Sequence, residues 1–268
     1  MIKFDYHTHS IHSIDSTTPI DSMVQQAANL GLLEYAVTDH VDFTFPSKEI
    51  IDLCTTIPAY VEDVLRVKEA FEGQIKVLLG VELGLRPDCA KIGQEIANAH
   101  PFDIIIGSMH DFNGIGFTRK QFYEGKSKHQ AYGDYLQNAL DTIKACDCFD
   151  VLGHLGYMQR YAPYEDKSLD YQEFAGLFDD IIKALIQKGK GMEINTAGFY
   201  YGLGSFHPQV EVVKRYFELG GEILTIGSDA HTTANVAQYF DKTYDILKSI
   251  GVPHITSFDQ RTPKAVAL

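Results

Sequence analysis

The sequence predicts an α/β fold in which seven strand-helix units close into a parallel barrel. Two observations lead to this prediction. Short apolar segments alternate strictly with longer amphipathic ones, as in a parallel sheet wrapped by helices. In addition, ligand-type residues follow six of the seven predicted strands. Only a closed ring brings so many strand ends around one point, so a barrel is favoured over an open sheet.

The composition indicates one globular domain spanning residues 1–268. The chain is 45% hydrophobic, and no flexible linker or short-period repeat interrupts it. Its net charge of −13, without a basic run, argues against binding to nucleic acid or an anionic membrane. The four cysteines lack C-x-x-C spacing, and we find neither a signal peptide nor a long apolar run. We therefore expect reduced thiols in a soluble cytoplasmic protein.

The first strand is predicted at residues 2–6 and leads directly into His7-Thr8-His9. Residues i and i+2 of an extended segment point to the same side, so His7 and His9 can offer two imidazoles to one metal ion. A loop over 10–16 precedes a helix that is expected to end near Leu30 and Gly31. Its predicted start has Thr18 as N-cap, Pro19 in the first turn and Asp21 after it. Its predicted apolar stripe is Met23, Val24, Ala27 and Leu30.

The other strands are short apolar runs, several of them nearly continuous, as expected for strands buried on both faces. The other helices have apolar residues three and four positions apart. Pro208 can open one of them, and Gly220-Gly221 can stop it. The long loop over 111–125 is of a length typical of functional loops. The predicted strands are 34–37, 75–79, 102–106, 149–152, 191–194 and 222–226, with a short one at 254–256, and the helices are 58–71, 88–99, 128–145, 169–188, 208–219 and 236–250.

Nine side chains at or near the carboxyl ends of the strands are candidate metal ligands. Imidazole and carboxylate donors without thiolate suit Zn, Mn or Fe in the divalent state. Nine donors exceed the needs of one tetrahedral ion, so we expect two or three clustered ions, with Glu82 bridging a pair. The candidates are His7, His9, Asp15, His40, Glu82, His110, His154, Asp229 and His231.

The alternative for each of these histidines is an ordinary core or surface role. That alternative explains the set poorly, because six of the eleven histidines follow strands. Three others lie elsewhere and are expected to be structural: His100, His129 and His254. His12 lies in the ligand loop but out of step with the other donors. His207 can either begin a helix or line the pocket.

The chain resembles the polymerase and histidinol phosphatase (PHP) superfamily. Its length is similar to that of the histidinol-phosphate phosphatase branch. So is the segment Gly153-His154-Leu155 followed by Arg160-Tyr161. The matching motifs occur in family order along almost the whole chain. They are His7-Thr8-His9, Thr38-Asp39-His40, Gly80-Val81-Glu82, Gly107-Ser108-Met109-His110, Gly153-His154-Leu155, Glu193-Ile194-Asn195-Thr196 and Gly227-Ser228-Asp229-Ala230-His231.

The resemblance implies a distorted (β/α)7 barrel, similar to a TIM barrel, with a trinuclear metal site at the C-terminal rim of its strands. One ion would take His7, His9, Glu82 and Asp229. A second would share Glu82 and add His110 and His154. The third would take Asp15, His40 and His231. Many relatives have His at the position of Asp15, so the third site is richer in oxygen here and is expected to prefer Mn or Fe.

The expected reaction is hydrolysis of a small phosphomonoester, L-histidinol phosphate in histidine biosynthesis. A water that bridges two divalent ions loses its proton near neutral pH and can attack phosphorus. Arg160 is expected to hold phosphate oxygens, with Arg119, Tyr200 and His207 as further substrate contacts. Asp229, His231 or a metal-bound water would protonate the leaving oxygen. The alternative for Arg160 is a surface pair with Glu165 or Asp166.

One departure from the family pattern concerns the phosphate contacts. Some histidinol-phosphate phosphatases have a second phosphate-holding Arg shortly after the position of Thr196, whereas this chain has Ala197-Gly198-Phe199-Tyr200-Tyr201. A tyrosine hydroxyl could substitute, or the substrate could be another small phosphomonoester. The sequence also leaves open a phosphodiesterase or exonuclease, a metal-dependent amidohydrolase, and a non-catalytic metal-binding module that would not need Arg160.

Overall fold

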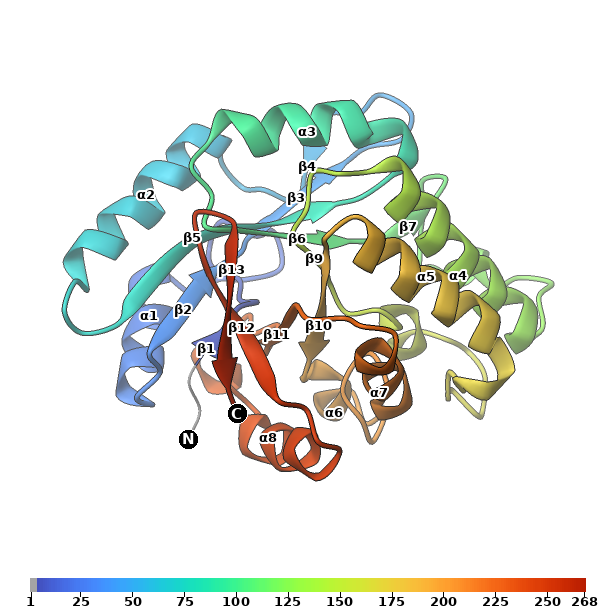
Figure 1. The fold of residues 1–268 in the computed structure, drawn as a ribbon. Coiled ribbons are helices and arrows are strands. Elements are labelled where there is room, and N and C mark those ends of the chain that lie inside the picture. The colour runs from blue at the N-terminus through green and yellow to red at the C-terminus, as the bar shows by residue number, and fades with distance from the viewer. Residues whose placement is uncertain (1–3) are drawn as a thin grey trace.

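The computed structural model describes residues 4–268, and seven parallel strands form its central sheet (Figure 1). The predicted first strand includes residues 2 and 3, which lie outside the described part. Runs such as Ile104-Ile105-Ile106 are fully buried, as expected for strands covered on both faces. In their order around the sheet the strands are β1 (Phe4–Asp5), β2 (Glu34–Val37), β5 (Lys76–Gly84), β6 (Ile104–Ser108), β9 (Val151–Leu152), β10 (Gly191–Asn195) and β11 (Leu224–Gly227).

The ring is closed between the two ends of the sheet by backbone hydrogen bonds. Tyr6 N donates to Ile226 O (3.0 Å), and His9 N donates to Ala230 O (2.8 Å). Asp229 N donates in turn to His7 O (2.8 Å). On the β1 side all three bonds lie just beyond the strand, so the closure is irregular. The predicted distorted (β/α)7 barrel is thus confirmed.

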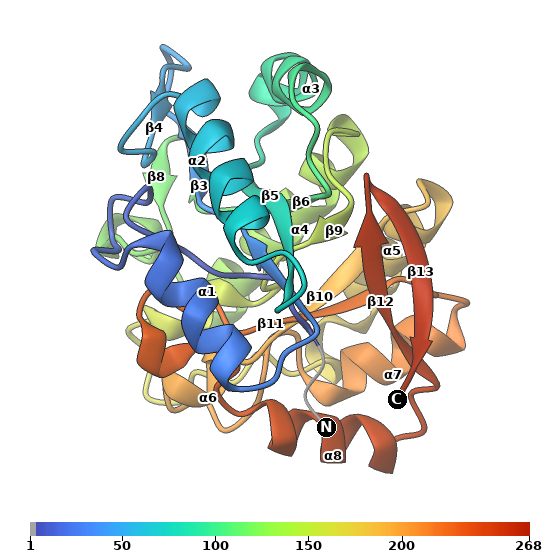
Figure 2. The ribbon, with the colours of Figure 1, turned by 90° about the vertical axis from the view of Figure 1, so that its left-hand side faces the viewer.

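Helices cover the outside of the barrel (Figures 1 and 2). They are α1 (Ile20–Asn29), α2 (Ile57–Ala70), α3 (Ala90–Ala99), α4 (Lys128–Ala145), α5 (Ala175–Gln187), α7 (Val210–Glu218) and α8 (Phe240–Ser249). α4 has the predicted bounds, because Ser127 and Gln130 form a capping box at its start. Within the described residues, no helix is both long enough and apolar enough to cross a membrane.

Two expectations for the first helix were wrong. Thr18 does not cap α1, because Pro19 occupies the N-cap position and the Thr18 hydroxyl donates instead to His231 O (3.2 Å). Leu30 does not belong to the buried stripe, since it follows the last helical residue and is 44% exposed. The predicted inward residues Met23, Val24 and Ala27 are buried.

Several predicted boundaries shift because short elements flank the main ones. Two predicted helices, 88–99 and 169–188, begin with 3₁₀ turns rather than as α-helix, and the predicted loops contain short strands and a one-turn helix. β5 extends to Gly84, so Glu82 lies within the strand and not beyond it. The additional elements are β3 (His40–Phe43), β4 (Ile50–Ile51), β7 (Asp111–Phe112), β8 (Ile115–Gly116), α6 (Ala197–Tyr200), η1 (Pro87–Cys89), η2 (Lys120–Phe122), η3 (Tyr157–Arg160), η4 (Gln172–Phe174) and η5 (Thr233–Asn235).

The chain ends in an antiparallel hairpin of β12 (His254–Asp259) and β13 (Thr262–Ala267), of which only a short strand at 254–256 was predicted. The hairpin packs against the amino ends of the barrel strands. Its Arg261 donates to Asp150, just before β9, at 2.9 Å, and Phe258 N donates to the Tyr6 hydroxyl at 2.9 Å. The opposite, C-terminal rim therefore remains open to ligands.

Candidate metal centre and active site

All nine predicted donors lie at the C-terminal rim of the barrel. His7 and His9 follow β1, and Glu82 lies near the end of β5. The remaining donors come from five other segments. These are Asp15 before α1, His40 at the start of β3, His110 after β6, His154 after β9, and Asp229 with His231 after β11.

The donor atoms form overlapping groups that could each hold a metal ion. In each group, three ligand atoms lie within 4.8 Å of one another. Glu82 belongs to two groups, as expected for a bridging carboxylate. The groups are His7, His9 and Glu82; Glu82, His110 and His154; His9, His40 and His231; and His40, Asp42 and His110.

The two aspartates that these groups omit approach them closely. Asp229 Oδ1 lies 3.4 Å from His9 Nε2 and 3.8 Å from His7 Nε2. Asp15 Oδ2 lies 3.1 Å from His231 Nε2 and 3.7 Å from His40 Nε2. The geometry thus brings all nine predicted residues together. Two of the groups agree with the first two implied sets, whereas a third joins His9 to His40 and His231, and a fourth includes Asp42, which was not predicted.

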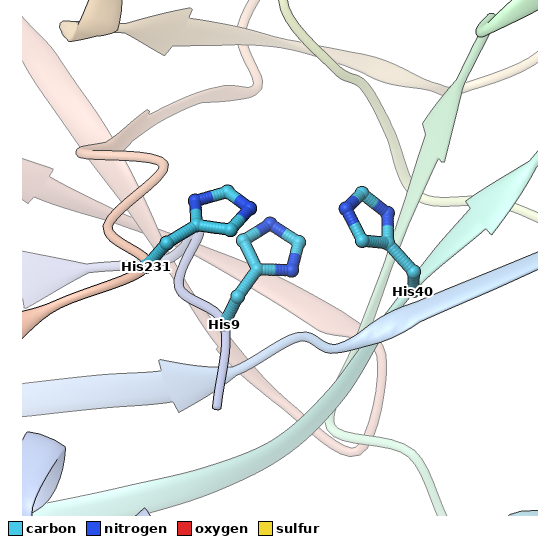
Figure 3. Close-up of side chains that lie close together, drawn as sticks. All are labelled: His9, His40 and His231. Carbon is cyan, nitrogen blue, oxygen red and sulfur yellow. The ribbon is translucent and has the colours of Figure 1, made fainter. Parts of the chain in front are cut away.

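Three imidazoles from distant parts of the chain face one another at the centre of the rim (Figure 3). The His9 ring stacks against both His40 and His231, with centroid separations of 4.2 and 4.1 Å. Stacked rings bring their nitrogens close together. Such an arrangement is unfavourable for protonated histidines but suits neutral imidazoles around a cation.

Unpaired polar atoms within the cluster fit bound cations. Buried donors and acceptors in proteins nearly always have a hydrogen-bond partner, and each one left without costs about 1–3 kcal/mol. Here the unpaired atoms gather at one place, which a shared set of cations explains. Among residues 4–268, those without a hydrogen bond include His7 Nε2, His9 Nε2, His40 Nδ1, Glu82 Oε2 and His231 Nε2, although His40 Nδ1 lies 2.7 Å from Glu82 Oε2 and His231 Nε2 lies 3.1 Å from Asp15 Oδ2.

Outer residues orient the histidines so that one nitrogen remains free for the cluster. Glu193 Oε1 lies 2.7 Å from His7 Nδ1, and Asp42 Oδ1 lies 2.9 Å from His110 Nδ1. Such carboxylate contacts fix the ring and raise its basicity as a ligand. These roles were not predicted. Glu193 did leave a signal in the sequence, as a charged residue inside a buried apolar strand two positions before Asn195.

Asp39 is a second residue whose role was not predicted. It is fully buried and accepts hydrogen bonds from Ser10 N (2.6 Å) and from the hydroxyls of Ser10 (2.7 Å) and Ser13 (2.6 Å). Ser13 Oγ in turn lies 3.1 Å from His9 Nδ1. Asp39 therefore fixes the loop after β1, which delivers both His9 and Asp15 to the rim.

The electrostatics of the donor set are mixed. Burial opposes protonation of His7, His40, His110 and His231, but nearby carboxylates raise the pKa of each. Burial lowers the pKa of His9 and of His154, which keeps both rings unprotonated. Burial opposes ionisation of Glu82, but the neighbouring histidines, His7 foremost, hold its pKa well below the usual range. Neutral His9 and His154 and an ionised Glu82 are the protonation states that metal ligation requires.

Arg160 lies beside the cluster in a cavity of about 650 Å³ and is not a surface residue paired with Glu165 or Asp166. Its side chain is 3% exposed and donates to Asp229 Oδ2 (2.9 Å), Asn195 Oδ1 (3.2 Å) and His207 Nε2 (3.4 Å). The guanidinium also lies over the rings of Tyr157 and Tyr201, 5.0 and 4.5 Å from their centroids. None of the three hydrogen bonds uses Nη1.

The other predicted substrate contacts have different positions. Arg119 and Tyr200 are exposed and line the mouth of the same cavity. His207 is buried behind Arg160 and lines a separate, smaller cavity of about 430 Å³. The structure therefore places His207 against the guanidinium of Arg160 rather than among the residues that line the main cavity.

The remaining histidines belong to none of the donor groups. His12 pairs with Asp63 on α2 (2.9 Å), and His129 pairs with Glu173 (2.6 Å). His254 Nε2 lies 2.8 Å from Glu222 O at the opposite end of the barrel. The ambiguous His12 is thus engaged outside the cluster.

Comparison with known proteins agrees with this geometry. The model of the PHP domain family matches residues 5–197. The chain belongs to the PHP domain family. Among curated PHP relatives, the histidinol-phosphatase of Lactococcus lactis is 31% identical over 96% of this chain and 95% of its own length. A probable histidinol-phosphatase of Clostridium acetobutylicum is 28% identical over 97% and 98%.

Solved structures give the same result for this PHP chain. The crystal structure of the Lactococcus lactis histidinol phosphate phosphatase, complexed with Zn, L-histidinol and phosphate, superposes with a TM-score of 0.88 at 29% identity, covering 98% of both chains. A putative histidinol phosphatase from Listeria monocytogenes superposes with a TM-score of 0.74 at 20% identity, covering 90% of this chain and 99% of the other. The second likeness concerns the fold alone.

Proposed function

We propose that this PHP protein is a metal-dependent phosphomonoesterase that hydrolyses L-histidinol phosphate to L-histidinol and phosphate, a step of histidine biosynthesis. The observation that carries the proposal is the convergence of nine donor side chains beside the buried Arg160 in one open cavity. Near full-length similarity to the Lactococcus lactis enzyme, crystallised with Zn, L-histidinol and phosphate, supports the choice of substrate.

The residues fit two or three divalent ions, Zn, Mn or Fe. His7, His9, Glu82 and Asp229 would hold one, Glu82, His110 and His154 a second, and Asp15, His40 and His231 a third. When bound, such ions lower the pKa of a coordinated water and neutralise charge on phosphate oxygens. The donor set has three carboxylates and six imidazoles, so it is only modestly anionic by itself.

Arg160 is proposed to bind and orient the phosphate. Its Nε and Nη2 are held by His207, Asn195 and Asp229, and none of these bonds uses Nη1. Charge-assisted hydrogen bonds to an oxyanion from such a fixed donor are strong and geometrically selective. His207 thereby acts on the phosphate through Arg160.

The proton for the leaving oxygen is proposed to come from Asp229 or His231. Asp229 Oδ2 faces Arg160, and its Oδ1 faces His9. His231 Nδ1 lies 2.9 Å from the Asp229 carbonyl oxygen, which leaves Nε2 on the side of Asp15 and the cavity. Both residues line the cavity. Burial opposes ionisation of Asp229, but Arg160 holds its pKa well below the usual range, so His231 is the better proton donor when only two ions are bound.

This chain lacks the second phosphate-holding Arg that some histidinol-phosphate phosphatases have after the position of Thr196. Arg160 is therefore the buried guanidinium that is proposed to contact the phosphate. Ala197 occupies the start of α6, and Tyr201, just beyond the helix, packs its ring on Arg160 at 4.5 Å. Tyr201 therefore stabilises the single guanidinium. Tyr200 remains exposed at the mouth of the cavity, within reach of a ligand's outer part.

We further propose that residues 1–268 form one PHP-type phosphatase domain that acts on a small phosphorylated substrate in the cytoplasm and binds no nucleic acid. The net charge of −13 opposes a polyanionic partner. The four cysteines are free, three of them buried, which suits a reducing compartment. A phosphodiesterase would instead cleave diesters such as nucleic acids, and the net negative charge of the chain does not favour binding of these polyanions.

The direct test is a panel of phosphomonoesters and phosphodiesters assayed against protein loaded with Mn, Fe or Zn. The proposal predicts inorganic phosphate release from L-histidinol phosphate, with a kcat/KM well above that for other monoesters and little cleavage of diesters. A preference for diesters, or for a monoester unrelated to histidinol, would refute the proposed substrate.

A further inference from the structure

Asp52 lines the main cavity, and its carboxylate has no hydrogen-bond or ion-pair partner within residues 4–268. Five aspartates line the cavity. Four have partners: Asp15 lies against His231 (3.1 Å), Asp42 against His110 (2.9 Å), Asp111 accepts from Gly114 N (2.9 Å), and Asp229 pairs with Arg160 (2.9 Å). Within residues 4–268, no hydrogen bond or ion pair uses the Asp52 carboxylate. Asp52 is half-buried, and within the described residues no Lys or Arg side chain forms an ion pair with it.

The backbone holds Asp52 in a fixed place between the two loops of the metal centre. Asp52 O accepts from Ile14 N (3.0 Å), the residue before Asp15. On its other side, Ile51 is the strand partner of Asp42, which orients His110. Asp52 also has a left-handed backbone with φ of 64°, which aspartate tolerates better than most residues.

The wall around Asp52 is apolar although it faces solvent. Ile14, Phe45 and Ile51 line the same cavity and are 67%, 51% and 38% exposed. Large apolar side chains at the mouth of a cavity suit a ligand with an organic part. Asp52 follows Ile51 directly and accepts a backbone hydrogen bond from Ile14, so it shares the cavity with these apolar side chains. Burial, and after it the charge of Asp42, raise the pKa of Asp52, whereas His40 and His110 act in the opposite direction.

We propose that Asp52 receives the ammonium group carried by the alcohol half of the substrate. This inference rests on the proposed function and extends it to substrate choice. L-histidinol phosphate has its ammonium group on the carbon next to the phosphate-bearing carbon, with the imidazole one carbon further out. With the phosphate at Arg160 and the donor cluster, the ammonium meets the one free carboxylate, and the imidazole lies against Ile14, Phe45 and Ile51.

The test compares L-histidinol phosphate with its deamino analogue, in which hydrogen replaces the ammonium group. Asparagine tolerates the left-handed backbone at position 52, so Asp52→Asn removes the charge with little strain. For L-histidinol phosphate we expect Asp52→Asn to lower kcat/KM by about 10- to 100-fold, mainly through KM, because a charged hydrogen bond is lost. For the analogue the two proteins should differ less than about twofold.

The matched control is Glu49→Gln, which removes the same charge from the same hairpin outside the cavity and should leave both substrates unaffected. Equal losses on both esters, an unchanged kcat/KM in Asp52→Asn, or the same loss in Glu49→Gln would overturn the role of Asp52. A loss that persists without the amine but disappears when phenyl replaces the imidazole would also overturn it, by assigning Asp52 to the ring. Wild-type protein that hydrolyses neither ester would instead refute the proposed function, and this inference with it.

Discussion

Glu193 contacts two histidines, His7 and His154, that belong to different donor groups. One carboxylate oxygen lies 2.7 Å from His7 Nδ1, and the other accepts the backbone N–H of His154 at 2.7 Å. All three residues are buried, so water does not compete for these bonds. A single carboxylate on β10 therefore sets the orientation of candidate ligands that follow β1 and β9.

This contact predicts the effect of Glu193→Gln. The amide can accept from only one of the two N–H groups, so either His7 or the backbone of His154 loses its partner. We expect metal affinity and kcat to fall by roughly 10- to 100-fold, the usual size of such outer-residue effects. Metal titration and phosphate release measure both. Glu222→Gln, an exposed residue at the opposite end of the barrel, is the control and should resemble the wild type.

Arg160→Ala separates an enzyme from a metal-binding module. Because Arg160 is proposed to touch phosphate and not metal, its loss should lower kcat/KM by roughly 100-fold or more while the metal content stays unchanged. Arg160→Lys keeps the charge but loses the planar fork, so it should recover only part of the activity. Elemental analysis alongside phosphate release is the measurement, and full turnover in Arg160→Ala would contradict the assignment.

Removal of metal should destabilise the fold at the rim. The cluster then leaves several buried nitrogens and a carboxylate oxygen unpaired, and ions that bind only the native state stabilise it. We expect the Tm to fall by several degrees in chelator and to recover with added Zn or Mn. Calorimetry of wild type and Glu82→Ala checks this, since the variant should respond much less. Identical melting with and without metal in the wild type would contradict a metal centre built from these residues.

Asp5 predicts a pH dependence of stability. Burial raises its pKa from 3.8 to about 6, although it accepts hydrogen bonds from Ser228 and Ala237 N. The folded state therefore binds the proton more tightly than the unfolded state, so this contribution to stability is present below pH 4 and is lost as the pH rises through 6. The loss amounts to roughly 3 kcal/mol. Urea unfolding of wild type and Asp5→Asn should give a difference in free energy that falls by about this amount between pH 4 and pH 7, and a constant difference would contradict it.

The barrel could be predicted from the sequence because its signals are local. Apolar runs such as Ile104-Ile105-Ile106 mark buried strands, and Ser127 with Gln130 marks the start of α4. Ligand-type residues at successive strand ends then imply a common rim. The sequence does not contain comparable local signals for Thr18, whose hydroxyl bonds to the distant His231 backbone, or for the final hairpin, whose Arg261 finds its partner Asp150 only in the folded barrel.

The candidate ligands could be predicted for the same reason, whereas the residues that orient them could not. His7 and His9 stand out by their spacing, but Glu193 becomes meaningful only when β10 is known to lie behind His7. Asp42 and Asp39 likewise act through contacts between segments that are distant along the chain. The position of His207 behind Arg160, rather than in the main cavity, depends on packing of the same kind.

The central claim is that the donors at the rim hold ions that hydrolyse a phosphomonoester. It is tested most directly by measuring inorganic phosphate released from L-histidinol phosphate, together with metal content, for the wild type and Glu82→Gln. We predict two or three equivalents of divalent metal and rapid release in the wild type, and at least one equivalent lost with a fall in turnover of about 100-fold or more in the variant. Glu82→Gln protein with full metal content and full turnover would contradict the account.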